Sequence, residues 1–182
     1  MPLRMDTTTS STIQLPWIKN VVIRNLVSTD LPGLEWEGEF THFRRVYAEA
    51  YQRALRGLSI LWVADLPPKG IIGQVFIQLI CDRLELADGQ QRAYLYSFRV
   101  RPAYRSSGLG SRILQVVEND LRLREYEIVT LNVAKDNNRA QKLYERFGYR
   151  IVAHEPGVWS FVDDHGAWQQ VEEPAWRMEK IL

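Results

Sequence analysis

The stretch Arg-Ser-Ser-Gly-Leu-Gly at residues 105–110 is the part of this sequence best suited to hold a charged ligand. Residues 93–100 before it alternate as a half-buried strand does, and apolar residues from 109 to 121 recur at helical spacing. A turn from a strand into a helix leaves backbone N–H groups unpaired and points the positive end of the helix dipole at one place. The sequence therefore predicts an anion site, and a phosphate or pyrophosphate fits it.

Three classes of phosphate-binding turn can be compared with these residues. A nucleotide P-loop requires Lys and then Ser or Thr after its second glycine, but Ser111 and Arg112 follow Gly110, so this class is excluded. A dinucleotide-binding turn requires a third glycine where Ile113 stands, and no strand–helix–strand unit opens the chain. The third class has the form Arg/Gln-x-x-Gly-x-Gly after a strand in mid-chain, and residues 105–110 match it.

A second pattern follows the glycine turn. Residues 128–133 read Ile-Val-Thr-Leu-Asn-Val and predict a strand, after which Asp136 and Asn137 suit the start of a helix. Apolar residues then recur at helical spacing until Gly148. From 137 to 149 the chain reads Asn-x-x-Ala-x-x-Leu-Tyr-x-x-x-Gly-Tyr.

Together the two patterns resemble those of the GCN5-related N-acetyltransferases, the GNAT family, which use acetyl-coenzyme A (acetyl-CoA). The resemblance covers residues 92–153, about a third of the chain. It implies a single-domain α/β fold, with a mixed central sheet of about seven strands flanked by helices on both faces. It also implies an acyltransferase that moves an acetyl group from acetyl-CoA to a primary amine of a small molecule or of a protein or peptide. A non-catalytic coenzyme A-binding sensor or interaction module with the same fold is the alternative.

By this resemblance, the acetyl-CoA contacts come from the strand end, the glycine turn, the second strand and the second helix. They are Phe98, Arg99, Val100, Arg105, Ser106, Ser107, Gly108, Leu109, Gly110, Ser111, Asn132, Asn137 and Tyr144. Backbone groups of the first three would pair with the pantetheine amides, and residues 105–111 would hold the pyrophosphate. The glycines let the backbone approach the ligand, because no Cβ stands in the way.

Tyr144 is the catalytic residue that the resemblance implies. The family has a tyrosine at this place, as the acid that protonates the departing thiolate. A phenol has an ordinary pKa of about 10, so it carries its proton at neutral pH. Core packing is the other interpretation of an aromatic residue four positions after Ala140.

The sequence assigns no general base. No Asp or Glu occurs from 92 to 105, where some relatives have a carboxylate on the strand before the turn. Four titratable residues fall in an early region that often lines the acceptor site in the family, although surface positions are the simpler interpretation: Glu35, Glu37, Glu39 and His42. Deprotonation of the amine through water stays open.

Composition narrows the classes of function and partner that remain. The chain has 182 residues with 23 Lys and Arg against 22 Asp and Glu, which suits one domain and gives no electrostatic case for nucleic acid or a membrane surface. One cysteine excludes a disulfide framework, and the histidines show no metal-ligand spacing, so no metal is expected. Without a signal peptide or a membrane-length apolar run, a cytoplasmic protein is expected. Its expected partners are acetyl-CoA and an amine acceptor, and a homodimer is left open.

The elements that must position these residues can be predicted in order. Residues 1–16 are expected to be a flexible N-terminal tail and residues 17–182 an N-acetyltransferase domain. The patterns predict β-α-α-β-β-β-α-β-α-β, with antiparallel pairing among the consecutive strands and a parallel pair across the later strand–helix–strand unit. Residues 157–173 predict a Trp-rich hairpin insertion, followed by a closing strand near 176–180. The hairpin either covers the core at the sheet edge or forms an acceptor-pocket wall or a dimer contact.

Overall fold

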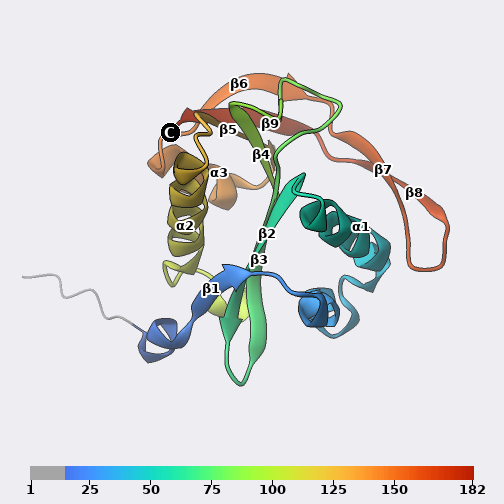
Figure 1. Cartoon of the computed structure of the whole chain (residues 1–182), viewed down its shortest axis with the longest axis vertical. Coiled ribbons are helices and arrows are strands. Elements are labelled where there is room, and N and C mark those ends of the chain that lie inside the picture. Colours follow the sequence, from blue (N-terminus) through green and yellow to red (C-terminus); the bar gives the residue numbers. More distant parts are fainter. Residues whose placement is uncertain (1–14) are drawn as a thin grey trace, which may run out of the picture.

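The computed structural model of the protein describes residues 15–182. These residues contain a seven-stranded sheet with the strand order β1-β2-β3-β4-β5-β9-β6 (Figure 1). Its strands are β1 (Val22–Asn25), β2 (Ser59–Leu66), β3 (Gly70–Gln78), β4 (Arg92–Val100), β5 (Ile128–Ala134), β6 (Arg150–Glu155) and β9 (Ala175–Ile181). Most of the expected tail lies outside the described residues; Pro16 within it begins the 3-10 turn Pro16–Asn20.

The strand directions agree with the prediction of a mixed sheet. β1 to β4 pair antiparallel in succession, β4 and β5 pair parallel, and β9 pairs antiparallel with both β5 and β6. Helix α1 (Arg44–Leu55) covers one face, and α2 (Leu109–Leu123) and α3 (Asn138–Arg146) cover the other (Figure 1). This confirms the α/β fold with helices on both faces.

Helix α2 is fixed by its apolar face. Leu109, Ile113, Val117 and Leu121 recur at helical spacing and are all buried against the sheet. Burying a side chain of this size contributes about 1.5–3 kcal/mol. This burial of the apolar face, more than the helix propensities of its residues, therefore fixes the orientation of α2 on the sheet.

Helix α1 covers the opposite face by the same mechanism. Its residues Tyr47 and Ala50 are buried against Leu61, Val63 and Phe76 of β2 and β3. Because side chains alternate along a strand, the intervening residues of β2 and β3 face α2. These two strands are thus buried on both sides and form the rigid centre of the sheet.

The first of the two predicted early helices is wrong in type. Residues Ser28–Gly38 form 3-10 turns instead of an α-helix, because Pro32 has no N–H to donate and both Trp36 (φ 46°) and Glu37 (φ 56°) are left-handed. The segment is fastened by Arg24, whose guanidinium contacts Asp30 at 2.7 Å and Asp65 of β2 at 3.0 Å.

The C-terminal hairpin consists of β7 (Val158–Val162) and β8 (Trp168–Glu172), which form a two-stranded sheet of their own. Its Phe161 packs 4.8 Å from Phe43 at the start of α1, between ring centroids. The hairpin therefore does not extend the main sheet: its strands pair with each other, and its aromatic side chains pack on the start of α1.

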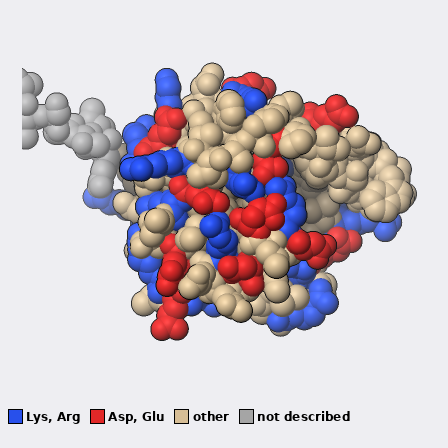
Figure 2. Space-filling model, turned by 90° about the horizontal axis from the view of Figure 1, so that it is seen from above, with Lys and Arg blue, Asp and Glu red and all other residues tan. Residues whose placement is uncertain are grey.

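Charged side chains of both signs intermingle on the face shown in Figure 2, and the hairpin projects from it as a largely uncharged lobe. Within residues 15–182, no helix is long and apolar enough to cross a membrane.

Candidate active site

An opening between β4 and β5 is the central feature of the site. The two strands pair from Arg92 and Ile128 as far as Leu95 and Leu131, and then continue without pairing to each other. Ser97 has a left-handed φ of 51°, and the register of β4 against β3 shifts beside it. The bulge bends β4 away, so its unpaired backbone groups can bind an extended chain that carries amides.

The glycine turn lies at the open end of β4. Ser107 closes it, because its Oγ donates to the carbonyl oxygen of Tyr104 at 2.6 Å and accepts from the N–H of Leu109 at 3.3 Å. Gly108 has φ 86°, which an L side chain rarely adopts. Among residues 15–182, the N–H groups of Gly108, Gly110 and Ser111 have no acceptor. The turn therefore has the donors and the helix start that an anion requires.

The turn, β4 and α3 lie close together. A Cβ on Gly110 would lie 3.5 Å from Leu143 and 3.8 Å from the ring of Phe98. Arg105 is exposed and donates from Nε to the carbonyl oxygen of Val100 at 2.8 Å, which ties the strand end to the turn. At the start of α3, Asn137 caps the helix by accepting from the N–H of Ala140 at 3.1 Å.

Asn132 occupies the opposite face of β5. Val129, Leu131 and Val133 face α2, so alternation turns Thr130 and Asn132 toward the α1 face. The side-chain carbonyl oxygen of Asn132 is buried and has no hydrogen-bond partner in the described part of the chain. Asn132, which the family resemblance places among the acetyl-CoA contacts, thus has its side chain on the face of the sheet opposite to α2.

Tyr144 lies on the α2 face beside the opening. It is 6% exposed, with its ring centroid 6.4 Å from that of Phe98 and 5.6 Å from that of Tyr149. Burial raises the pKa of its phenol above the ordinary value, and the nearby Tyr94 adds to the shift. The hydroxyl has no partner among residues 15–182, so Tyr144 is both a core ring and a protonated, unengaged donor.

Sequence reasoning missed two phenols on the α1 face. Tyr94 and Tyr96 of β4 stack with centroids 5.9 Å apart, and burial raises the pKa of each to about 12. Both are therefore neutral at physiological pH. The alternation of residues along β4 could have predicted that both phenols share one face. Tyr94 lies beside the opening, because it pairs with Thr130 one position before the last residue pair between β4 and β5.

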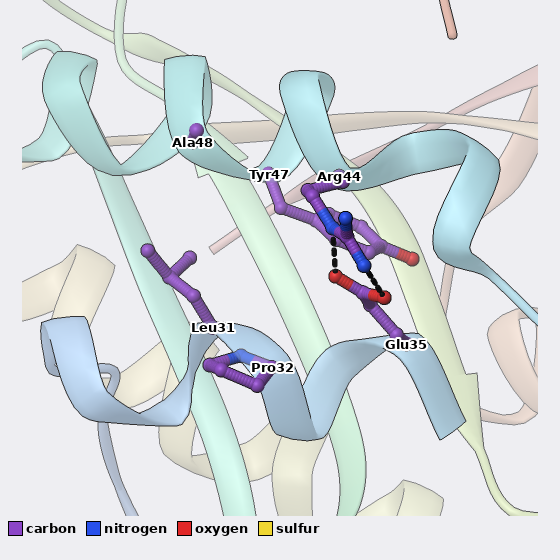
Figure 3. Close-up of a pocket in the computed structure, with 6 residues that line it drawn as sticks. All are labelled: Leu31, Pro32, Glu35, Arg44, Tyr47 and Ala48. Carbon is purple, nitrogen blue, oxygen red and sulfur yellow. Dashed lines mark hydrogen bonds and ion pairs between the residues drawn. The ribbon is translucent and has the colours of Figure 1, made fainter. Parts of the chain in front are cut away.

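Two of the three early acidic residues, Glu35 and Glu37, are engaged in ion pairs. Hydrogen bonds from Arg44 and Thr41 lower the pKa of Glu35, and a hydrogen bond from Arg101 lowers that of Glu37. Figure 3 shows the Glu35–Arg44 pair at a hollow of about 210 Å³ between the Ser28–Gly38 segment and α1. A carboxylate held in this way is a weak base.

The chain belongs to the acetyltransferase (GNAT) family, whose sequence profile matches residues 23–149. A Bacillus subtilis (strain 168) protein, the uncharacterized N-acetyltransferase YycN, is 30% identical over 90 residues, which make up 50% of this chain and 54% of that protein. The chain spans about half the length of the curated relatives that it matches.

Solved structures share the fold. Ard1 from Thermoplasma volcanium has a TM-score of 0.68 at 17% identity, covering 90% of this chain and 98% of that one. Arabidopsis thaliana NAA60 in complex with acetyl-CoA has a TM-score of 0.63 at 19% identity, covering 89% and 98%. The mixed sheet and the order of its elements are therefore those of GNAT structures.

Proposed function

We propose that this protein is an N-acetyltransferase that transfers the acetyl group of acetyl-CoA to a primary amine. The proposal rests on the opening between β4 and β5. A turn suited to an anion lies at one end of this opening, and a protonated phenol lies at the other. The fit to the donor rests on the unpaired N–H groups of the turn and on the space in front of Gly108, where an added Cβ would meet nothing within 4 Å.

In this proposal the donor lies extended along the open edge of β4. Backbone groups of residues 98–100 pair with the pantetheine amides, and residues 105–111 hold the pyrophosphate. Since α2 and α3 cover one face of the opening, the amine approaches the thioester from the face that carries Tyr94 and Asn132. The new N–C bond forms as the C–S bond breaks, and the amine releases one proton.

Tyr144 has the proton-donor role in the transfer. Tyr144 protonates the sulfur as the C–S bond breaks, so that coenzyme A leaves as a neutral thiol. Burial keeps the phenol protonated at neutral pH before the transfer. The amine releases its proton to water, and the Tyr144 phenolate regains a proton from water. The Glu35 and Glu37 carboxylates are engaged by arginines, which supports a route without a carboxylate base.

The function is tested by measuring thiol release from acetyl-CoA with a panel of small amines and peptides, together with the mass of each acceptor. Thiol release that depends on the acceptor, with one acetyl group added to an amine, is the expected result. Tight binding of acetyl-CoA without turnover on any acceptor would instead identify a coenzyme A sensor. Failure to bind acetyl-CoA would overturn both functions.

A further inference from the structure

Arg99 is an arginine on the α1 face that forms no ion pair within residues 15–182. It lies in β4 beyond the Leu95–Leu131 pair, and its side chain is half-buried. Its Nη1 donates to the phenol oxygen of Tyr47 at 2.6 Å. Its guanidinium carbon lies 4.2 Å from the ring centroid of Phe40 and 5.1 Å from that of Phe43.

Arg99 lacks the carboxylate partner that several other arginines of the described residues have. Arg24 and Arg83 each lie within 3.0 Å of a carboxylate oxygen, and Arg101 pairs with Glu37. No carboxylate oxygen lies within 4.0 Å of the Arg99 nitrogens in the described residues. Burial raises the pKa of the Tyr47 phenol, so this partner stays neutral. Arg99 is thus a half-buried cation surrounded by a neutral phenol and two aromatic rings. These neighbours compensate its positive charge only in part.

The surroundings of Arg99 favour an anion over a second cation. Phe40 and Phe43 already present their faces to a guanidinium, and a further ammonium near them would meet like charge. The hairpin extends this aromatic surface, since Trp159 stacks 6.0 Å from Phe43 between ring centroids and is 41% exposed. The guanidinium fork matches a carboxylate in two parallel hydrogen bonds.

We infer that Arg99 binds a carboxylate of the acetyl acceptor, so that the acceptors are primary amines that also carry a carboxylate. This inference rests on the proposed function, because it concerns the second substrate of the same reaction. The carboxylate can belong to a free amino acid or to an acidic residue near the amino terminus of a peptide. Both sources have the same recognised chemistry, and Arg99 determines specificity in either case.

The test compares acceptors that differ in one carboxylate. One arm uses phenylalanine against phenylalanine amide, and the other uses short peptides that begin Met-Glu against Met-Gln. In at least one arm, the parent enzyme should prefer the carboxylate form by about 10-fold or more in kcat/KM, the range of a charge-assisted hydrogen bond. The arm that shows the preference identifies the source. An amide preferred equally or better in both arms would overturn the inference.

Two variants assign the preference to Arg99. Arg99→Met should lower the acid-to-amide ratio of kcat/KM by about 10-fold or more, whereas Arg99→Lys, which keeps the charge and loses the fork, should lower it less. Arg101→Met is the matched control: it removes a neighbouring arginine that Glu37 already neutralises, and the ratio should persist. An unchanged ratio in Arg99→Met would contradict the inference.

A binding measurement separates this inference from the proposed function. N-acetylphenylalanine and the N-acetylated Met-Glu peptide each have the carboxylate but no free α-amine to acetylate, so their affinities for the protein with bound coenzyme A do not depend on turnover. Calorimetry should show weaker binding of at least one of them to Arg99→Met than to the parent, with melting temperatures reported for both proteins. Equal affinities of the two proteins for both probes would overturn the role of Arg99, whereas weaker binding in a protein without acetyl transfer would uphold it and overturn only the transferase.

Discussion

Leu95 of β4 and Leu131 of β5 form the last residue pair that joins the two parallel strands. Both side chains are fully buried beneath α2, so the opening starts at a fixed point of the core. Tyr144 lies on one face of the opening and Tyr94 on the other. Core packing therefore positions the chemical groups of the site, as it positions the sheet.

Tyr144→Phe tests the proposed acid. The ring and its packing remain and only the hydroxyl is lost, so kcat should fall by about 10²–10⁴-fold, with little change in acetyl-CoA affinity or melting temperature. Because burial raises the pKa of Tyr144, the parent should keep this acid protonated throughout the neutral pH range. Tyr149→Phe, which alters the adjoining buried phenol, is the control and should keep its kcat. Normal turnover in Tyr144→Phe would leave the residue a packing tyrosine.

Gly108→Val tests the anion turn. A Cβ at this position would meet no atom within 4 Å, so the harm comes from φ 86°, which a β-branched residue adopts only with strain. Acetyl-CoA affinity should fall by at least about 10-fold, the effect of a strain of about 1–3 kcal/mol on the binding conformation. Gly108→Asn should be milder, because asparagine tolerates the left-handed region. Calorimetric titration checks the series, and equal affinity in all three proteins would place the anion elsewhere.

Gly157→Ala tests the role of the hairpin. With φ 69°, an added Cβ at Gly157 would collide with the carbonyl oxygen of Glu173, so the base of β7 and β8 must open. We expect acetyl-CoA affinity to persist and acceptor kcat/KM to change several-fold. Gly166→Ala at the hairpin tip is the control, since φ is 84° but the nearest side-chain atom, on Arg45, is 3.5 Å away. Loss of acetyl-CoA binding in Gly157→Ala would show that the hairpin supports the donor side instead.

Lys180→Met tests a buried ion pair between β9 and α2. The Nζ of Lys180 lies 2.6 Å from an oxygen of Glu118, whose side chain is 4% exposed. Removing one partner of a buried pair costs about 3–5 kcal/mol, because the remaining charge stays desolvated. Arg122, 3.6 Å from the same oxygen, should hold the loss of unfolding free energy in urea to the lower end of this range. Adding Glu118→Gln to Lys180→Met should recover part of the loss, and a further loss would contradict this explanation.

The unfolding free energy at low pH tests the Arg24–Asp30 contact. Hydrogen bonds from Arg24 hold the pKa of Asp30 below its ordinary value, against an opposing effect of burial. A carboxyl whose pKa is lower in the folded state stabilises the fold above its unfolded pKa, about 3.9, and this contribution disappears as pH falls through the folded value.

Asp30→Asn should therefore lower the unfolding free energy at pH 7 by about 1–3 kcal/mol, the range of a hydrogen bond to a charged group. Its deficit against the parent should shrink as pH falls below about 4. Asp82→Asn, at an exposed carboxylate, is the control and should have little effect at either pH. A deficit that does not depend on pH would show that the effect is not electrostatic.

Local patterns were sufficient for much of this fold. The helix after Gly108, the cap at Asn137 and the strand pairing around β4 follow from periodicity and turn chemistry, which act over a few residues. The position of β9 between β5 and β6 could not be predicted this way, because strand order depends on contacts far apart in sequence. The Ser97 bulge was also missed, and with it the turn of Arg99 toward Tyr47. Such features arise from packing between elements.

The place of β9 in the sheet has a consequence for how such a protein can diversify. β9 is held on β5 by pairing from Ile128 and Ile181 to Ala134 and Ala175, while β7 and β8 form a detour between β6 and β9. Doubling the length of a flexible connection costs only about 0.6 kcal/mol of closure entropy. Insertions and deletions in the detour can thus accumulate without shifting the register beside the opening. Under the proposed function, acceptor choice could then drift during evolution while the donor half is inherited intact.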